Sequence, residues 1–290
     1  MHPAPSVIIF TVFTGLGFGY LVWLGIGMPF VLGMNAFFAF FVAFLLSVGG
    51  LISSTFHLGN PKNAYKSFSQ WKSSWLSREG WLAVLTLLCA GLFAFLLIFL
   101  GKHTALLGYL SAVLAILTVA ATSMIYIQIK AVPRWNHCSV FFYFMTISLA
   151  GGAILAGQTA AAIVLTMTAV VAQIAMWSIG DGRFAKAGST IESATGLGKI
   201  GKVRLFEPPH TGDNYLLKEM AYVVGRKHAA KLRMLTLVFM GAVPIILLAI
   251  MPVSIFSTII IVASHLIGAL FSRWLFFAQA EHVVKLYYGR

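Results

Sequence analysis

Charged residues are scarce in this chain. Only 9% of its 290 residues are Asp, Glu, Lys or Arg, and 60% are hydrophobic. Soluble domains usually contain about 45–50% apolar residues, so the composition excludes a soluble protein and predicts one that crosses a membrane several times. The formal net charge of +13 does not indicate nucleic-acid binding, because the basic residues lie in short segments between apolar runs and form no soluble basic face.

Cysteine is scarce as well. Cys89 lies inside an apolar run and Cys138 at the edge of another, so neither has the spacing of a CxxC motif or an iron–sulfur ligand set. We therefore expect no cluster held by this chain. The start, Met-His-Pro-Ala-Pro, lacks a charged region and a small-residue cleavage site, so we expect the first apolar run to be a retained span.

Long apolar runs, in contrast, occupy most of the chain. A helical span needs about 20 apolar residues to cross about 30 Å of hydrocarbon, and an isolated span can satisfy its backbone in lipid only as a helix. We predict an all-α integral membrane protein with a single membrane domain over residues 1–290. The predicted transmembrane helices, eight in number, cover residues 6–27, 31–56, 80–100, 105–129, 139–157, 160–180, 232–251 and 253–280.

The distribution of basic residues predicts the orientation. With these spans, all twenty Lys and Arg residues except Lys102 fall on the side of the N-terminus, and so do all seven acids. Lys and Arg concentrate on the cytoplasmic side of membrane proteins. We therefore expect both termini in the cytoplasm, together with the long loop 181–230.

The long loop is the only substantial segment outside the apolar runs. Its first half is rich in glycine and basic residues and is expected to be irregular. Its second half, with Asp213 as a helix N-cap, predicts an amphipathic helix on the surface or against a partner. The apolar residues at helical spacing are Leu217, Met220, Ala221 and Val224. Residues 196–201 match G-x-G-x-x-G, but no strand precedes them, so we expect no nucleotide site.

The positions of the histidines indicate whether this chain could bind haem. Two axial histidines would have to lie on facing helices at similar depth, and only His265 of the eight histidines lies well inside a span. We therefore expect no haem in this chain. His265 is an ionisable group within the membrane. It is a candidate for a proton path, and a neutral histidine bonded to a neighbouring helix is an equal alternative.

The stretch 57–81, which we call the collar, concentrates polar chemistry between two apolar runs. Ser77 is a predicted N-cap, with Glu79 in the first turn of the following helix. A capped helix with an interfacial Arg78–Glu79 pair would explain these residues alone. However, His57 ends the preceding helix on the same side, so a histidine and a carboxylate lie at one membrane surface. Together they can bind an aromatic headgroup and exchange protons with it, under the tryptophans Trp71, Trp75 and Trp81.

Two more clusters lie on this side. Pro133 ends one predicted helix, and Arg134 suits the headgroup zone. The neighbouring Asn136 and His137 add hydrogen-bonding capacity that anchoring does not require. The last cluster, on the final helix and its exit, consists of Arg273, Trp274, Glu281, His282 and Lys285.

These motifs resemble those of the dimethyl sulfoxide reductase membrane anchor family. The segments, in chain order, are His-Leu-Gly-Asn-Pro (57–61), Ser-Trp-Leu-Ser-Arg-Glu-Gly (74–80), Pro-Arg-Trp-Asn-His (133–137) and the stretch 273–288 that begins Arg-Trp-Leu-Phe-Phe. The resemblance covers essentially the whole chain. It implies an anchor that holds a molybdopterin catalytic subunit and a four-cluster iron–sulfur subunit to the membrane. Such an anchor passes electrons between a cluster and the quinone pool, so the implied cofactor is ubiquinone or menaquinone.

The resemblance also assigns residues. In the family a histidine and a glutamate near the cluster side are tied to quinol binding, and the matching positions are His57 and Glu79. We expect these two to deliver protons. The residues expected to bind the quinone are Trp75, Ser77, Arg78, Asn136 and His137. The residues expected to dock the partners are Lys62, Lys66, Lys72, Arg134, Arg273 and His282.

The predicted orientation separates branches of the family. A cytoplasmic functional face favours the branch similar to membrane-bound sulfite dehydrogenase, in a bacterial inner membrane. A periplasmic face would favour a quinol-oxidising dimethyl sulfoxide reductase anchor. Two other classes stay open: a secondary transporter, which usually has broken helices and midplane polarity, and an inert anchor with no bound quinone.

Overall fold

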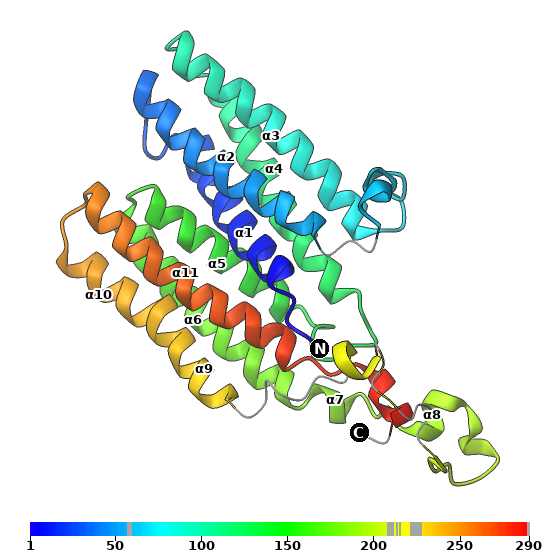
Figure 1. Cartoon of the computed structure of the whole chain (residues 1–290). Helices are drawn as coiled ribbons and strands as arrows, with labels where there is room; N and C mark the ends of the chain where they lie inside the picture. The colour runs from blue at the N-terminus through cyan, green and yellow to red at the C-terminus, as the bar shows by residue number, and fades with distance from the viewer. Residues whose placement is uncertain (57–59, 208–211, 213, 215, 221–227, 289–290) are drawn as a thin grey trace.

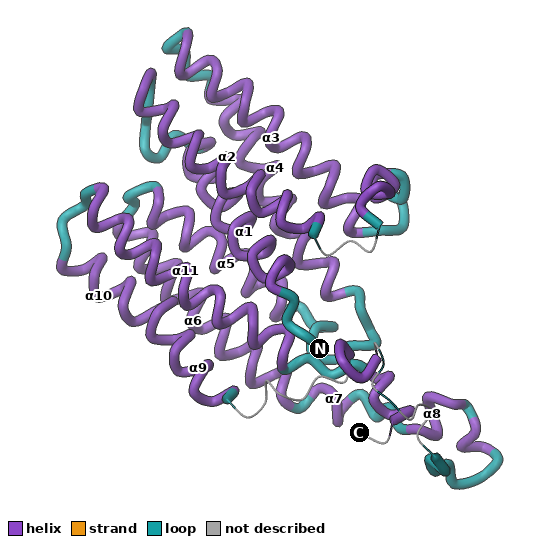
Figure 2. The backbone as a smooth tube through the Cα atoms, viewed as in Figure 1, coloured by secondary structure: helices purple, strands orange, loops and turns teal. Residues whose placement is uncertain are grey.

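The fold is a bundle of long helices. The computed structural model describes residues 1–56, 60–207, 212, 214, 216–220 and 228–288, and these residues form no strand (Figure 2). The long helices are α1 Pro5–Gly25, α2 Gly33–Thr55, α3 Trp75–Phe99, α4 Ala105–Ile127, α5 Ser139–Leu155, α6 Thr159–Asp181, α9 Ala229–Leu237, α10 Val243–Ile250 and α11 Ile255–Ala278. Short helical segments on the connections include η1 Pro61–Phe68, α7 Arg183–Lys186 and α8 Ile191–Thr195.

The long helices run back and forth between two ends of the molecule. Within the described residues, seven helices are long and apolar enough to cross a membrane, with α9 and α10 counted as one span over Ala229–Ile250. The shorter apolar helix α5 packs between α1 and α6. Both termini, η1, α7 and α8 lie at one end, and the tight helix-to-helix turns lie at the other (Figure 1). The prediction of a helical, multi-pass membrane protein is confirmed.

Helix α1 joins the two halves of the bundle. It packs against α2 and α4 on one side and against α5 and α11 on the other. Its contact with α5 depends on small residues: a Cβ atom at Gly19 would lie 1.9 Å from the backbone oxygen of Ser148, and one at Gly152 would lie 2.3 Å from the carbonyl of Gly19. Small residues allow helix backbones to approach closely in membranes. Glycine is therefore required at this crossing.

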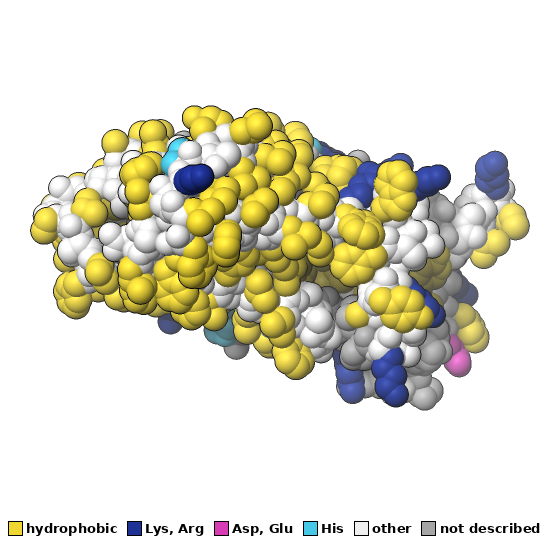
Figure 3. Space-filling view, turned by 90° about the horizontal axis from the view of Figure 1, so that it is seen from above, with side chains coloured by type: hydrophobic (Ala, Val, Ile, Leu, Met, Phe, Trp, Pro, Cys, Tyr) yellow, Lys and Arg dark blue, Asp and Glu magenta, His cyan; other side chains and the backbone are white. Residues whose placement is uncertain are grey.

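One end of the molecule carries most of the charge. On the face drawn in Figure 3, most Lys and Arg side chains gather at the right, while the rest of the face is mainly apolar. The N-terminus packs against the end of α11 here, where the terminal amino group of Met1 donates to the backbone oxygen of Ala280 at 2.6 Å. A cation suits the C-terminal end of α11, because the helix dipole is negative there.

The start of the third span differs from the sequence prediction. Helix α3 begins at Trp75, before the predicted start at residue 80, and Ser74 is its N-cap. The prediction of Ser77 as N-cap is therefore wrong. The physical reason is that Ser77 has other partners: its hydroxyl donates to the backbone oxygen of Ser67 and accepts from the backbone N–H of Gln70 at 3.2 Å.

The seventh predicted span is helical but not uniform. A π-helical segment, Val238–Ala242, joins α9 to α10 and precedes Pro244. Proline cannot donate a backbone hydrogen bond, so the regular α-helical pattern is interrupted at Pro244. Single π-helical turns are a known local irregularity within longer α-helices. The span thus stays continuous through a residue that breaks the regular hydrogen-bond ladder.

The long loop is more regular in its first half than predicted, because α7 and α8 form short helices there. Gly196, with φ of 71°, ends α8, which explains the first glycine of the G-x-G-x-x-G match as a helix terminator. Most of the amphipathic helix predicted from Asp213 lies outside the described residues, including Ala221 and Val224. A helical turn is described over Leu216–Met220.

Candidate functional site

Within the collar, the segment that precedes α3 packs onto the first turns of this helix. Besides the contacts of Ser77, the indole Nε1 of Trp81 donates to the backbone oxygen of Phe68 at 3.0 Å. The Phe68 and Trp81 rings meet edge to face, with 5.4 Å between their centroids. At Gly80 a Cβ atom would lie 3.1 Å from the Phe68 ring. The end of η1 is therefore held against α3 by contacts on two successive turns.

An aromatic pocket lies on the outer side of this contact. It has a volume of about 630 Å³ and is lined by Phe68, Ser69, Trp71, Trp75, Arg78, Trp81 and Leu82. The Arg78 guanidinium lies 4.4 Å from the Trp75 ring centroid, and it donates to the backbone oxygens of Trp71 and Lys72 at 2.9 and 2.7 Å. A volume and a lining of this kind suit a flat aromatic ligand.

Glu79 does not line this pocket and points into the bundle instead. Glu79 is only 4% exposed, and the hydroxyl of Thr122 on α4 donates a hydrogen bond to its carboxylate. No Lys, Arg or His of the described residues forms an ion pair with it. The interfacial Arg78–Glu79 pair is thus not formed, because successive helix residues point about 100° apart. An unpaired buried carboxylate within a span is costly and usually functional.

Aromatic and cationic groups continue inward from Glu79. Tyr126 on α4 lies within electrostatic reach of both Glu79 and Arg273, and its ring packs on Trp135 with 5.4 Å between centroids. The Arg273 guanidinium lies 3.5 Å from the ring centroid of Phe144. Arg273 is only 2% exposed. The prediction that Arg273 docks a partner is therefore wrong, because α11 directs this side chain into the bundle.

The segment between α4 and α5 is fixed by an ion-pair cluster. Arg134 and Arg233 each lie 2.6 Å from a carboxylate oxygen of Asp181. Because Asp181 is half-exposed, solvent screens these pairs, and their effect is to position the segment. Arg134, a predicted docking residue, thus has a partner within this chain.

The side chains of Asn136 and His137 form hydrogen bonds with nearby backbone groups. The Asn136 side chain donates to the backbone oxygen of Ile127 at 2.5 Å. Nδ1 of His137 accepts from the backbone N–H of Ser139 at 3.1 Å, at the start of α5. Burial, followed by the nearby charge of Arg183, lowers the pKa of His137. These contacts do not join Asn136 or His137 to the aromatic pocket, so their role in binding a quinone remains a prediction.

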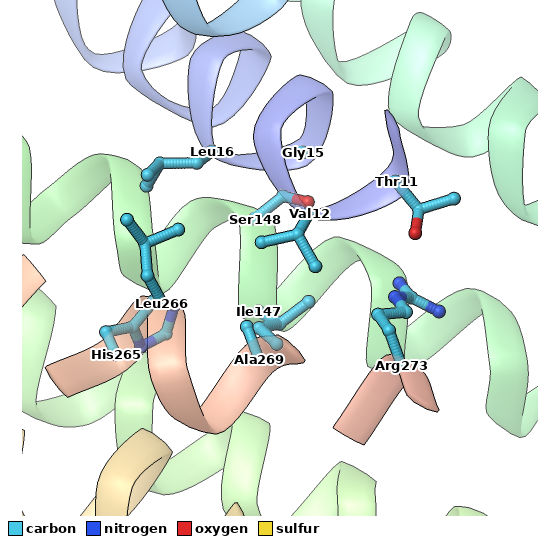
Figure 4. Close-up of a pocket in the computed structure, with 10 residues that line it drawn as sticks. All are labelled: Thr11, Val12, Gly15, Leu16, Ile147, Ser148, His265, Leu266, Ala269 and Arg273. Carbon is cyan, nitrogen blue, oxygen red and sulfur yellow. The ribbon is translucent and has the colours of Figure 1, made fainter. Parts of the chain in front are cut away.

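Two further predicted histidines, His265 and His282, also lie apart from the pocket. His282 accepts from the backbone N–H of Val284 at 3.0 Å, and burial and then the chain's terminal amino group lower its pKa. His265 is 2% exposed and lines a cavity of about 20 Å³ with Arg273. Figure 4 shows both side chains coming from α11 at different ends of this cavity. A cavity of this size holds one water molecule.

The other predicted residues divide into two groups. Lys62, Lys66 and Lys72 are exposed on the collar, so their role in docking stays a prediction. His57 lies outside the described residues. Sequence reasoning missed Thr122 and Tyr126, although both are polar and one helical turn apart in an apolar run, which places them on one face of α4.

Comparison with known proteins places the chain in a family. The family model for the DMSO reductase anchor subunit (DmsC) matches residues 1–289. The chain belongs to the DMSO reductase anchor subunit family. This family provides the membrane anchors of molybdopterin oxidoreductase complexes, which also contain catalytic and iron–sulfur subunits, and such anchors generally interact with quinones.

Two curated relatives resemble this anchor protein. A sulfite dehydrogenase subunit of Allochromatium vinosum is 28% identical, and the similarity covers 99% of each chain. The anaerobic dimethyl sulfoxide reductase chain YnfH of Escherichia coli is 32% identical over 193 residues, which cover 61% of this chain and 65% of that protein. No solved structure matches the chain.

The hydrogen bonds of Ser77 provide a test of the collar in this anchor protein. Replacing Ser77 with Ala removes two bonds that hold the collar, each contributing about 0.5–1.5 kcal/mol. Together the two bonds contribute about 1–3 kcal/mol, so we expect trypsin to cleave at Lys62, Lys66 or Lys72 roughly 5- to 150-fold faster, because the collar opens more often. Ser73→Ala is the control, since the Ser73 hydroxyl bonds, among the described residues, only to the exposed Gln70 side chain. Equal cleavage of both variants would contradict the role of Ser77.

Proposed function

We propose that this anchor protein passes electrons between a cluster of a partner iron–sulfur subunit and a quinone bound near the ends of α2 and α3, in a complex that oxidises sulfite. Membership of the anchor family supports the general role. Similarity over 99% of the chain to a subunit of a sulfite dehydrogenase supports the substrate of the complex. The molybdenum chemistry belongs to a catalytic partner, and this chain carries the quinone site.

Glu79 is the single observation that carries the proposal. An inert anchor gains nothing from a carboxylate that is 4% exposed and has only the Thr122 hydroxyl as its hydrogen-bond partner among the described residues. Burying such a group costs stability unless it has a function. A carboxylate at the charged end of the bundle can exchange protons with a ligand and with water.

The aromatic pocket supports a separate binding role. When bound, a quinone supplies electron transfer coupled to proton transfer. Trp75 and Trp81 present apolar ring surfaces for stacking, and Arg78 provides a positive charge beside them. Because Glu79 points into the bundle and does not line the pocket, we assign binding to the pocket and proton exchange to Glu79.

The remaining expected residues keep their proposed roles, except Ser77, which was expected to bind the quinone but does not line the aromatic pocket. His57 is the second candidate for proton delivery, and Ser77 holds the collar that forms the pocket. Asn136 and His137 border the same charged end, and His265 is the candidate for a proton path. Docking of a four-cluster iron–sulfur subunit and a molybdopterin subunit is assigned to the exposed residues Lys62, Lys66 and Lys72, and to Arg134 and His282 as further candidates.

The orientation of the complex is part of the proposal. We take α5 as an eighth span, since its 17 residues reach the lower end of the usual span length. All Lys and Arg residues except Lys102 then lie on the side of the termini. By the positive-inside rule this side is cytoplasmic, in a bacterial inner membrane. The quinone site and the catalytic partner would both lie at that face.

Membrane vesicles test function and orientation together. Sulfite is an anion that does not cross the bilayer unaided. We expect sulfite-dependent quinone reduction in inverted vesicles, which expose the cytoplasmic face, and activity in intact spheroplasts only after permeabilisation. Vesicles from a strain that lacks this chain are the control.

Two outcomes would contradict the proposal. Full activity in intact spheroplasts would place the functional side outside the cytoplasm. Quinol oxidation by dimethyl sulfoxide, without turnover of sulfite, would favour the second candidate, a dimethyl sulfoxide reductase anchor. That candidate is supported by the 32% identity to YnfH over 193 residues.

A further inference from the structure

A second groove lies at the charged end of the bundle, on the side of α1, α9 and α11. Its volume is about 800 Å³. Its lining is almost wholly apolar, and none of the lining residues is an acid. The lining residues are Pro3, Pro5, Ile8, Ile9, His228, Lys231, Leu232, Leu235, Leu270, Phe271 and Trp274.

The mouth of the groove carries two basic side chains, Lys231 and His228, which have no acidic partner among the described residues. Lys231 and His228 are both exposed, and no hydrogen bond or ion pair of their side chains occurs among the described residues. Arg233, on the same helix, is different because Asp181 binds it at 2.6 Å. The first turn of α9 also contains no acidic residue. The mouth therefore suits a negatively charged group.

The basic residues lie at one end of the groove, and its deeper lining is apolar on all three helices. On α9, Leu235 lies one turn deeper than Lys231, and on α11, Leu270 lies one turn deeper than Trp274. On α1, Ile9 lies one turn beyond Pro5. These helix ends share the end of the molecule where both termini lie (Figure 1). A ligand with a charged head and an apolar tail matches this gradient.

We infer that this groove binds an anionic phospholipid, with its phosphate at Lys231 and His228 and an acyl chain along Leu235, Ile9 and Leu270. Basic pockets between transmembrane helices on the cytoplasmic side are the usual sites for such headgroups. The indole of Trp274 is partly exposed and donates no hydrogen bond within the described residues. Its N–H is positioned to bond an ester oxygen, as tryptophans at membrane interfaces do.

A quinone fits this groove less well. A quinone headgroup is uncharged and exchanges protons on reduction, whereas the groove offers two basic side chains and no carboxylate. The aromatic pocket beside Arg78 and the neighbouring Glu79 suit a quinone better. The lipid site is thus distinct from the proposed quinone site, and its test does not depend on quinone activity.

Native mass spectrometry of the complete complex tests the lipid site. The complex is purified from membranes, delipidated, and exchanged into nanodiscs of phosphatidylcholine with or without phosphatidylglycerol. We expect phosphatidylglycerol to be retained in preference to phosphatidylcholine after release from the nanodisc. For Lys231→Gln we expect about fivefold lower retention of phosphatidylglycerol, which corresponds to the roughly 1 kcal/mol of one basic residue near an anionic lipid.

Two further variants make the test decisive. Lys186→Gln removes an exposed basic residue at the same end of the molecule but outside the groove, and we expect it to retain lipid normally. Leu235→Trp fills the groove, and we expect it to release the lipid while the complex stays assembled. Equal retention of both lipids, equal loss in the two lysine variants, or displacement of the lipid by added quinone would overturn the inference.

Discussion

Glu79→Gln is expected to lower the quinone-coupled turnover of the assembled complex by about 10²–10⁴-fold, the usual contribution of a general acid–base group. Glutamine keeps the shape of glutamate and can still accept the Thr122 hydroxyl bond, so the loss reflects proton exchange and not packing. Because Glu79 does not line the binding pocket, kcat should fall while KM for quinone changes little. The measurement is steady-state quinone reduction by the purified complex.

Two comparison variants separate the roles of the two faces of α3. Trp75→Ala removes part of the aromatic pocket and should raise KM for quinone with a smaller effect on kcat. Glu192→Gln changes a carboxylate in α8, on the long loop, and should leave both constants unchanged. If Glu79→Gln turned over at the rate of the unchanged complex, Glu79 would have no part in the reaction. Loss of the partner subunits in this variant would assign Glu79 to assembly.

Gly19→Ala should be the most damaging small substitution for the fold. Its added Cβ atom would lie 1.9 Å from the backbone oxygen of Ser148, so α1 and α5 would have to move apart along the contact that joins the two halves of the bundle. Overpacking of this kind costs about 1–3 kcal/mol. We expect a lower thermal unfolding temperature and a lower yield of the complex, measured after detergent extraction.

Gly49→Ala is the matched control for this prediction. Gly49 also lies in a long helix, α2, but a Cβ atom there would meet nothing within 4 Å. The same chemical change should therefore leave the unfolding temperature unchanged or raise it slightly, because alanine favours a helix over glycine. If both variants unfolded at the same temperature, close packing at Gly19 would not determine the stability of the bundle.

The path of the chain could be predicted from the sequence because the bilayer imposes strong rules. Apolar runs of sufficient length must form helices in lipid, and the helices α1, α2, α4 and α6 begin and end within a few residues of the predicted spans. The start of α3 was predicted less well. The boundary rule used Ser77 as a cap, whereas packing of the collar against Ser77 and Gly80 extends the helix back to Trp75.

The direction of each side chain could not be predicted in the same way. Arg78 and Glu79 are adjacent in the collar, and only the packing of α3 on α4 sends Arg78 to the aromatic pocket and Glu79 to Thr122. Arg273 follows the same principle. Interfacial position predicts an exposed arginine, but α11 buries it against Phe144, where the aromatic ring stabilises the cation.

The sequence by itself thus determined the membrane class, the helical architecture, the charged end and the family resemblance. These follow from composition, from runs of apolar residues and from motif order, which are properties of the chain read along its length. The tertiary structure decided which face of α3 each collar residue occupies, and that Arg273 is enclosed. It also decided that α1, α9 and α11 form a basic-mouthed groove. Such features arise when helices distant in sequence pack together, and no local pattern encodes them.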